Sequence, residues 1–140
     1  MLEGLRILIV EDDLLLAETV VAALEKAGCE VIGPAARVGQ AVELAERGGF
    51  DVALLDINLH GETCYPAAWL LLEQGVPFAF MTAYSPSAIP RPLAFVAVLA
   101  KPFGEPELLA MVAELRQRAL TVPASEADKP QLGSRPASAD

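Results

Sequence analysis

The chain has 140 residues, a length that fits one domain with a buried core and excludes two domains of ordinary size. Hydrophobic residues make up 54% of it, which excludes a disordered chain because such chains lack the apolar residues that offset conformational entropy. Nineteen acidic against ten basic residues give a net charge of −9, and this negative field disfavours contact with nucleic acid or anionic membrane surfaces.

Buried strands and amphipathic helices alternate in the apolar pattern. Asp13 can cap the first helix and Gly28 can end it, while Pro66 suits the first turn of the third helix and Gly75 its end. In chain order we predict a strand at 5–10, a helix from Asp13 to Gly28, a strand at 31–32, a helix at 38–45, a strand at 52–55, a helix at 66–75, strands at 76–81 and 95–99, and a helix at 105–120.

The stretch from Ser85 to Pro92 interrupts this alternation. Its prolines at 86, 90 and 92 each lack a backbone donor, so the fourth helix should be short or broken. After residue 120 the composition changes to Pro, Ala and Ser, and we expect a folded domain at 1–120 followed by a disordered tail at 121–140.

Strict alternation of strands and helices predicts an α/β fold, a doubly wound parallel sheet with helices on both faces, and a ligand site at the carboxyl ends of the strands. Polar residues gather at the predicted ends of four strands: Glu11, Asp12, Asp56, Thr82 and Lys101. Carboxylates crowded there repel by about 1 to 4 kcal/mol per pair at about 4 Å, so the site needs a counter-charge. Mg²⁺ prefers such oxygen ligands, and Lys101 would add positive charge.

This constellation suits phosphoryl transfer. A carboxylate beside Mg²⁺ is a competent nucleophile, so Asp56 would become an aspartyl phosphate. Thr82 and Lys101 could then bond phosphoryl oxygens, and Ala83 is too small to obstruct the entering group.

Four segments resemble the signature segments of the receiver domain of two-component response regulators, in that family's order: residues 7–13, 54–59, 81–83 and 101–103. The resemblance covers about residues 4 to 120 and implies a flavodoxin-like, five-stranded sheet in the order 2-1-3-4-5. It implies that Glu11, Asp12, Asp56 and the main-chain carbonyl of Asn58 hold Mg²⁺, that Asp56 accepts phosphate, that Thr82 is the switch hydroxyl and that Lys101 pairs with phosphate. The Lys101-Pro102 bond is expected to be cis.

Two departures from the family pattern concern residues near the site. Val98 stands three residues before the lysine, where the family usually has a Tyr or Phe that swings inward on activation. The stretch from Pro77 to Tyr84 resembles a divergent receiver subgroup with an aromatic residue two positions after the switch threonine and a shortened fourth helix. We hypothesise that Tyr84 replaces the missing aromatic, the alternative being a tyrosine packed over the sheet edge. The Asn58 side chain would position attacking water or cap a turn.

The resemblance implies a stand-alone response regulator that takes phosphate from a sensor histidine kinase or histidine phosphotransfer protein. It would then signal to a downstream protein or pass the phosphate along a phosphorelay, without being an enzyme beyond its own phosphorylation and dephosphorylation. Alternatives are a phosphorylation-independent adaptor and a Mg²⁺-dependent phosphatase or nuclease. A flavin-binding protein fails because Glu11 and Asp12 would repel the flavin phosphate.

Location and assembly are further expectations. No apolar run could span a membrane, and Met1 to Val10 lacks the features of a signal peptide, so we expect a cytoplasmic protein. Cys29 and Cys64 lack zinc-binding spacing and should be reduced, and the sole histidine, His60, should be a solvated loop residue. A homodimer could form through the apolar face of Trp69 to Leu72 and through cysteines at the surface.

Overall fold

The computed structural model describes residues 2–83 and 88–127, with side chains described as far as Thr121. Five parallel strands form one sheet in the order β2-β1-β3-β6-β7, and two short strands, β4 and β5, form a separate antiparallel hairpin. The predicted doubly wound sheet is confirmed, with β6 and β7 as its fourth and fifth strands. In chain order the elements are β1 (Arg6–Val10), α1 (Leu14–Lys26), β2 (Glu30–Ala35), α2 (Val38–Arg47), β3 (Val52–Asp56), β4 (Asn58–Leu59), β5 (Glu62–Thr63), α3 (Tyr65–Gln74), β6 (Phe78–Thr82), a 3-10 helix (Arg91–Leu93), β7 (Ala97–Ala100) and α4 (Glu105–Ala127).

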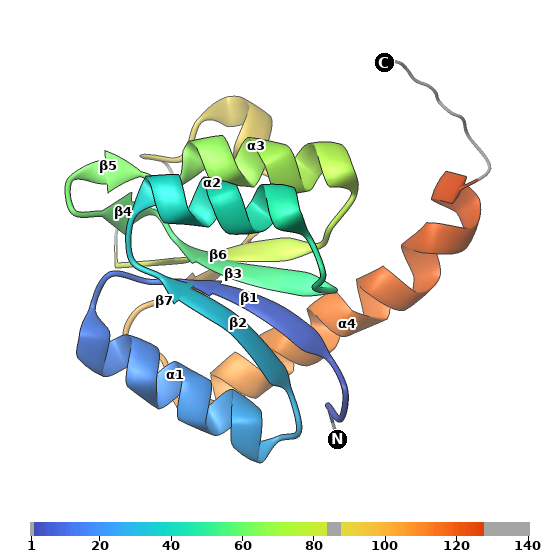
Figure 1. Ribbon diagram of the computed structural model, residues 1–140, viewed down its shortest axis with the longest axis horizontal. Coiled ribbons are helices and arrows are strands. Elements are labelled where there is room, and N and C mark those ends of the chain that lie inside the picture. The colour runs from blue at the N-terminus through green and yellow to red at the C-terminus, as the bar shows by residue number, and fades with distance from the viewer. Residues whose placement is uncertain (1, 84–87, 128–140) are drawn as a thin grey trace.

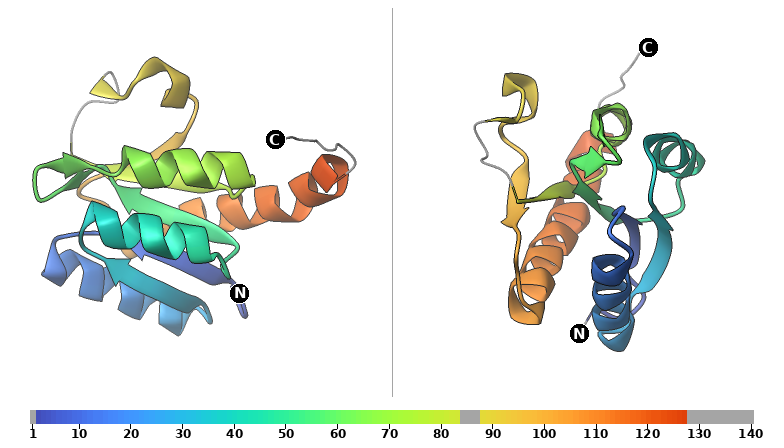
Figure 2. Two further views of the ribbon diagram at one scale, coloured as in Figure 1. Left: turned by 45° about the horizontal axis from the view of Figure 1, so that its top comes forward. Right: turned by 90° about the vertical axis from the view of Figure 1, so that its left-hand side faces the viewer.

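Helices cover both faces of this sheet. Helices α1 and α4 lie on one face and α2 and α3 on the other (Figures 1 and 2). Successive side chains of β1 point to opposite faces, so Ile7 and Ile9 enter the core beneath α1 and α4, while Leu8 and Val10 enter the core beneath α2 and α3. Burial on both faces explains why this strand is a continuous apolar run in the sequence.

The start of α1 is fixed beside the carboxyl end of β1. Asp13 Oδ1 accepts a hydrogen bond of 3.2 Å from the backbone N–H of Leu16, which confirms the predicted cap. At the other end, Gly28 has φ +101° and a Cβ there would lie 2.9 Å from the Glu3 Cα. Only glycine fits this close crossing of the N-terminal segment.

Strand β2 runs from Glu30 to Ala35 and is longer than the two residues predicted for it. The strand passes the Gly33-Pro34 step and pairs again with β1 where Ala35 lies opposite Val10. Gly33 has φ +100° and a Cβ there would lie 2.7 Å from the Ile9 carbonyl oxygen, so the irregular step requires glycine.

Strands β6 and β7 each begin two residues later than predicted, for a shared physical reason. The N–H of Val76 donates to the Leu71 carbonyl and closes the end of α3, and Pro77 has no N–H to give to a sheet. The N–H of Val96 likewise donates to Leu93 in a turn, which leaves Phe95 outside the sheet and 69% exposed. The apolar pattern assigned these residues to strands, but the N–H groups of Val76 and Val96 form hydrogen bonds within turns and not with a neighbouring strand.

The predicted weakness of the fourth helix is confirmed by the described residues between β6 and β7. They contain the three-residue 3-10 helix, which starts after Pro90 and buries Leu93. By contrast, α4 continues to Ala127, seven residues past its predicted end at Leu120. Of the tail expected to be disordered at 121–140, residues 128–140 lie outside those described.

Both cysteines are free and buried, so the expectation of cysteines at the surface is wrong. Cys29 belongs to the core beneath α1 and α4, and Cys64 to the core beneath α2 and α3. Burial raises the pKa of both thiols. Trp69 and Leu72 do lie at the surface, with 42% and 37% of their areas exposed. Within the described residues, no helix combines the length and apolar character needed to cross a membrane.

Truncation in the sheet should reveal how much this packing contributes. Leu54 is fully buried on the central strand β3, and we expect Leu54→Ala to lower the free energy of unfolding by about 2 to 5 kcal/mol because it opens a cavity. Leu14→Ala removes the same atoms from a side chain that is 73% exposed. This substitution should change the free energy of unfolding by less than about 0.5 kcal/mol. Urea denaturation of both variants measures the difference, and equal effects would contradict the assigned core.

Candidate functional site

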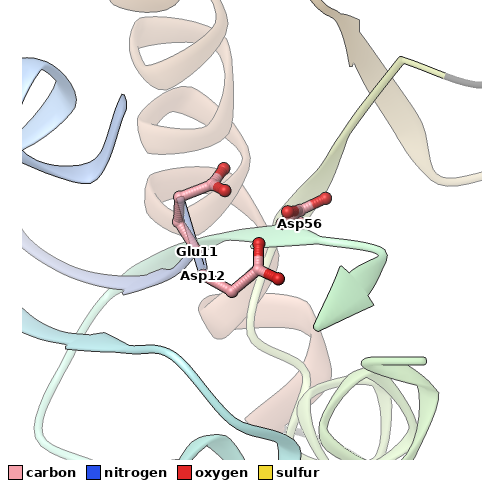
Figure 3. Close-up of side chains that lie close together, drawn as sticks. All are labelled: Glu11, Asp12 and Asp56. Atoms are coloured by element: carbon pink, nitrogen blue, oxygen red, sulfur yellow. The ribbon is translucent and has the colours of Figure 1, made fainter. Parts of the chain in front are cut away.

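Three carboxylates from two adjacent strands converge at the carboxyl edge of the sheet. Glu11 and Asp12 directly follow β1, and Asp56 is the last residue of β3, the neighbour of β1 (Figure 3). One carboxylate oxygen from each residue lies within 4.8 Å of the other two. Glu11 and Asp56 are buried and Asp12 is partly buried. The structure therefore brings together the three acids predicted for this site.

Lys101 reaches the same site from the end of β7, the outer strand on the β6 side of the sheet. Its Nζ atom lies 2.9 Å from Glu11 Oε1 and 3.3 Å from Asp56 Oδ2. The residue follows β7, and its N–H donates to the Thr82 carbonyl at 2.9 Å, which extends the β6 and β7 pairing to the strand ends. One ammonium thus pairs with two carboxylates that lie beside each other.

Backbone donors fix the orientation of all three acids. Glu11 Oε2 accepts the N–H of Asp13 at 3.0 Å. Asp12 Oδ2 accepts the N–H of His60 at 2.9 Å, and Asp56 Oδ1 accepts the N–H of Asn58 at 3.4 Å. These charge-assisted bonds hold the carboxylates in the cluster against their mutual repulsion.

Burial and neighbouring charges shift the pKa values of the site in different directions. Burial and the adjacent Glu11 carboxylate raise the pKa of Asp56 to about 7, against the opposing effect of Lys101. Burial opposes the charge of Lys101, but hydrogen bonding and attraction to Glu11 and Asp56 raise its pKa. Burial likewise opposes ionisation of Asp12, but the N–H of His60 and further bonds leave its pKa below the ordinary value.

The sequence prediction missed the β4–β5 hairpin that follows Asp56. His60 and Gly61 form its two-residue turn with φ values of +52° and +85°, the signs of a type I′ turn. The Asn58 side chain accepts the N–H of Gly61 at 3.0 Å, so it caps this turn, one of the two roles weighed for it. The His-Gly pair after a strand is the signal that could have indicated the hairpin. His60 is exposed as expected, but its backbone contributes to the site.

The remaining predicted residues surround the cluster. Thr82 is buried at the end of β6, the strand beside β3, and the Lys101-Pro102 bond is cis as expected. Val98 is paired with Phe80 and packs against the core beneath α2 and α3. Tyr84 lies outside the described residues. Ala83 is exposed and lines a cavity of about 290 Å³ together with Asp13, Leu16, Lys101, Pro102 and Phe103.

The donor set of the cluster fits a hard divalent cation. All three acids offer oxygen atoms, and their combined charge exceeds what the single ammonium of Lys101 can balance. Mg²⁺ binds through one or a few carboxylates and retains several waters, which suits a cluster at the rim of a sheet. A metal ion at this position would stabilise Asp56 in its ionised form.

Comparison with known proteins identifies the same kind of domain. The response regulator receiver domain family matches residues 7–113. The swarming motility regulation protein RssB of Serratia marcescens is 34% identical over 119 residues, which cover 81% of this chain and 54% of RssB. This chain spans between half and two thirds of the length of the curated relatives that it matches.

Solved structures agree with this family match. The receiver domain of the sensor histidine kinase PA1611 from Pseudomonas aeruginosa, which has a magnesium ion in its active site cleft, superposes with a TM-score of 0.70 and 29% identity, covering 84% of this chain and 99% of that one. SdrG from Sphingomonas melonis superposes with a TM-score of 0.71 and 34% identity, covering 80% of this chain and 96% of that one.

The raised pKa of Asp56 should make the metal-free protein less stable as pH rises. Between its ordinary pKa of 3.8 and about 7, Asp56 holds a proton in the folded protein that it releases in the unfolded chain. The free energy of unfolding should therefore fall across this window, and Asp56→Asn should flatten the slope. Urea denaturation at several pH values in the presence of a chelator measures it.

Asp51→Asn is the matched control for this titration. Partial burial opposes ionisation of Asp51, but bonds from Arg6 hold its pKa below the ordinary value, with Arg6 Nη2 3.1 Å from Asp51 Oδ1. The ionised Asp51 carboxylate stabilises the fold above that ordinary pKa, so Asp51→Asn should lower the free energy of unfolding near pH 7. Between about pH 4 and 7, however, the free energy of unfolding of this variant should depend on pH as it does in the parent. If the free energy of unfolding of Asp56→Asn fell with pH as steeply as that of the parent, Asp56 would not be the group responsible for the pH dependence.

Proposed function

Because this chain belongs to the response regulator receiver domain family, we propose that it accepts a phosphoryl group on Asp56 from a phosphohistidine of a sensor histidine kinase or histidine phosphotransfer protein. The observation that carries this proposal is the contact of the Lys101 ammonium with both the Glu11 and the Asp56 carboxylates. Such a positive group can balance the negative charge of the Asp56 carboxylate before transfer and that of the phosphoryl oxygens after it.

The metal part of the proposal concerns the acidic cluster. Glu11, Asp12, Asp56 and the main-chain carbonyl of Asn58 would hold Mg²⁺, which when bound supplies charge neutralisation to the transferred phosphoryl group. The support from this chain is the cluster itself, with three oxygen donors within 4.8 Å of one another. Asp13 and His60 orient two of these donors through their N–H groups.

Transfer requires the ionised form of Asp56. A carboxylate oxygen of Asp56 forms the new bond to phosphorus, and the bond between phosphorus and the donor imidazole nitrogen breaks, with its electron pair leaving on the imidazole. Lys101 then pairs with the phosphoryl oxygens, and Ala83 leaves room at the edge of the site. The hydroxyl of Thr82 would bond a phosphoryl oxygen and turn phosphorylation into a change at the end of β6.

The signal would leave through the strand ends that carry Thr82 and Lys101. The hydrogen bond between the Lys101 N–H and the Thr82 carbonyl ties the two residues, so a shift of one is passed to the other. We propose that this changed surface controls contact with a downstream protein or onward transfer in a phosphorelay. Val98 has no aromatic ring that could rotate inward on activation. The proposed role of Tyr84 in place of such a ring stays a prediction.

Labelling with a small acyl phosphate tests the phosphoacceptor. In the presence of Mg²⁺ the parent protein should incorporate phosphate, and Asp56→Asn should reduce incorporation to background because it removes the nucleophile. Asp51→Asn, which changes an acid at the opposite edge of the sheet, should be labelled like the parent. Intact-mass spectrometry measures the added phosphoryl group, and equal labelling of Asp56→Asn would overturn the proposal.

Calorimetry in buffers of different ionisation enthalpy tests the metal site. Mg²⁺ binding should release most of a proton at about pH 6 and little at about pH 8, because the ion binds the ionised form of an Asp56 whose pKa is about 7. Asp56→Asn should release no such proton and bind Mg²⁺ more weakly. Absence of binding at about millimolar Mg²⁺ would instead favour a phosphorylation-independent adaptor.

A further inference from the structure

We propose that the turn of the β4–β5 hairpin positions Asp12 for cation binding through a backbone donor, the N–H of His60. The inference rests on the proposed function, because it assigns a role within the same metal site. The donor lies 2.9 Å from Asp12 Oδ2 and comes from a residue 48 positions further along the chain. It therefore joins the end of β1 to the segment after β3 directly at the cluster.

Asp12 is the acid that most needs such an anchor. Glu11 and Asp56 are buried and both lie beside the Lys101 ammonium, whereas Asp12 is partly exposed and is not among the ion pairs of Lys101 found in the described residues. A partly exposed side chain samples several rotamers, and cation binding must offset the entropy lost when one is selected. The His60 N–H adds to the bonds from Asp56 and from the backbone N–H of Asp12 in favouring one rotamer in advance, and a carboxylate retains lone pairs for a metal ion.

The hairpin forms a rigid support for this donor. The N–H of Gly61 donates to the Asn58 side chain at 3.0 Å, and the N–H of Cys64 donates to the Ile57 carbonyl at 2.8 Å across the base of the hairpin. Leu59 anchors the hairpin in the core beneath α2 and α3, with 1% of its area exposed. The turn can thus hold the N–H of His60 in place while the imidazole remains outside.

The backbone conformation of the turn determines which residue types can supply the donor at position 60. His60 adopts φ +52°, a region that residues other than glycine seldom occupy, and Gly61 follows at φ +85°. The two positive φ values turn the chain back within two residues and present the His60 N–H toward Asp12. Position 60 therefore needs a residue with an N–H that tolerates this conformation, whatever its side chain.

An ester in place of the amide at position 60 tests the inference directly. The full chain can be assembled by joining residues 1–63 to residues 64–140 at Cys64, with His60 replaced by its α-hydroxy acid analogue, which keeps the imidazole and removes the N–H. Calorimetric titration should show Mg²⁺ binding about tenfold weaker than in an all-amide chain assembled in the same way. Equal or tighter binding by the ester chain would overturn the inference.

A pair of glycine substitutions separates positioning from general destabilisation. Gly61 and Gly49 have φ values of +85° and +89°, and an added Cβ would meet no atom within 4 Å at either residue, so alanine introduces comparable backbone strain at both. Gly61→Ala should weaken Mg²⁺ binding, and Gly49→Ala should not. Equal weakening in both variants would overturn the inference.

Amide exchange provides a readout that needs no metal. In the metal-free parent the His60 N–H should exchange slowly, and Asp12→Ala should accelerate it, whereas fast exchange in the parent would overturn the inference. The two proposals fail in different ways. An all-amide chain that binds no Mg²⁺ would overturn the proposed metal site and this inference together, while normal binding with no effect of the ester would overturn this inference alone.

Discussion

The electrostatic balance around Lys101 is the constraint on which the site depends. Glu11 and Asp56 are both buried, and two buried carboxylates side by side are costly unless a positive charge accompanies them. The ammonium that accompanies them comes from the end of β7, two strands beyond the strand that carries Asp56. The parallel order of the sheet makes this possible, because it places the carboxyl ends of β1, β3, β6 and β7 along one edge.

Most of this architecture could be predicted from the sequence because burial on both faces leaves a direct trace in residue type. Strands such as β1 and β3 are continuous apolar runs, and the polar residues that end them mark the edge where the site lies. The same reasoning placed β6 and β7 two residues too early. Val76 and Phe95 are apolar, but residue type does not show that turns occupy the backbone around them.

The hairpin after Asp56 shows a second limit of sequence reasoning. His60 contributes to the site through its backbone N–H, which almost every residue type possesses, so its side chain gave no indication of the role. The burial of Cys29 and Cys64 was also missed, because both follow polar or flexible segments and only the tertiary packing encloses them. Side chains that carry chemistry can be found by type, whereas groups that orient them are found only from the fold.

The outer strands of the sheet, β2 and β7, are poorly suited to pairing with a strand of another molecule. Pro34 interrupts the donors of β2, and β7 is only four residues long, so neither border presents a long, regular row of free amides and carbonyls. Such borders resist the addition of a strand from another molecule, which protects a chain rich in apolar residues from forming fibrous aggregates. Side chains on helices and loops are better suited to recognition, because their specificity can change without disturbing the sheet.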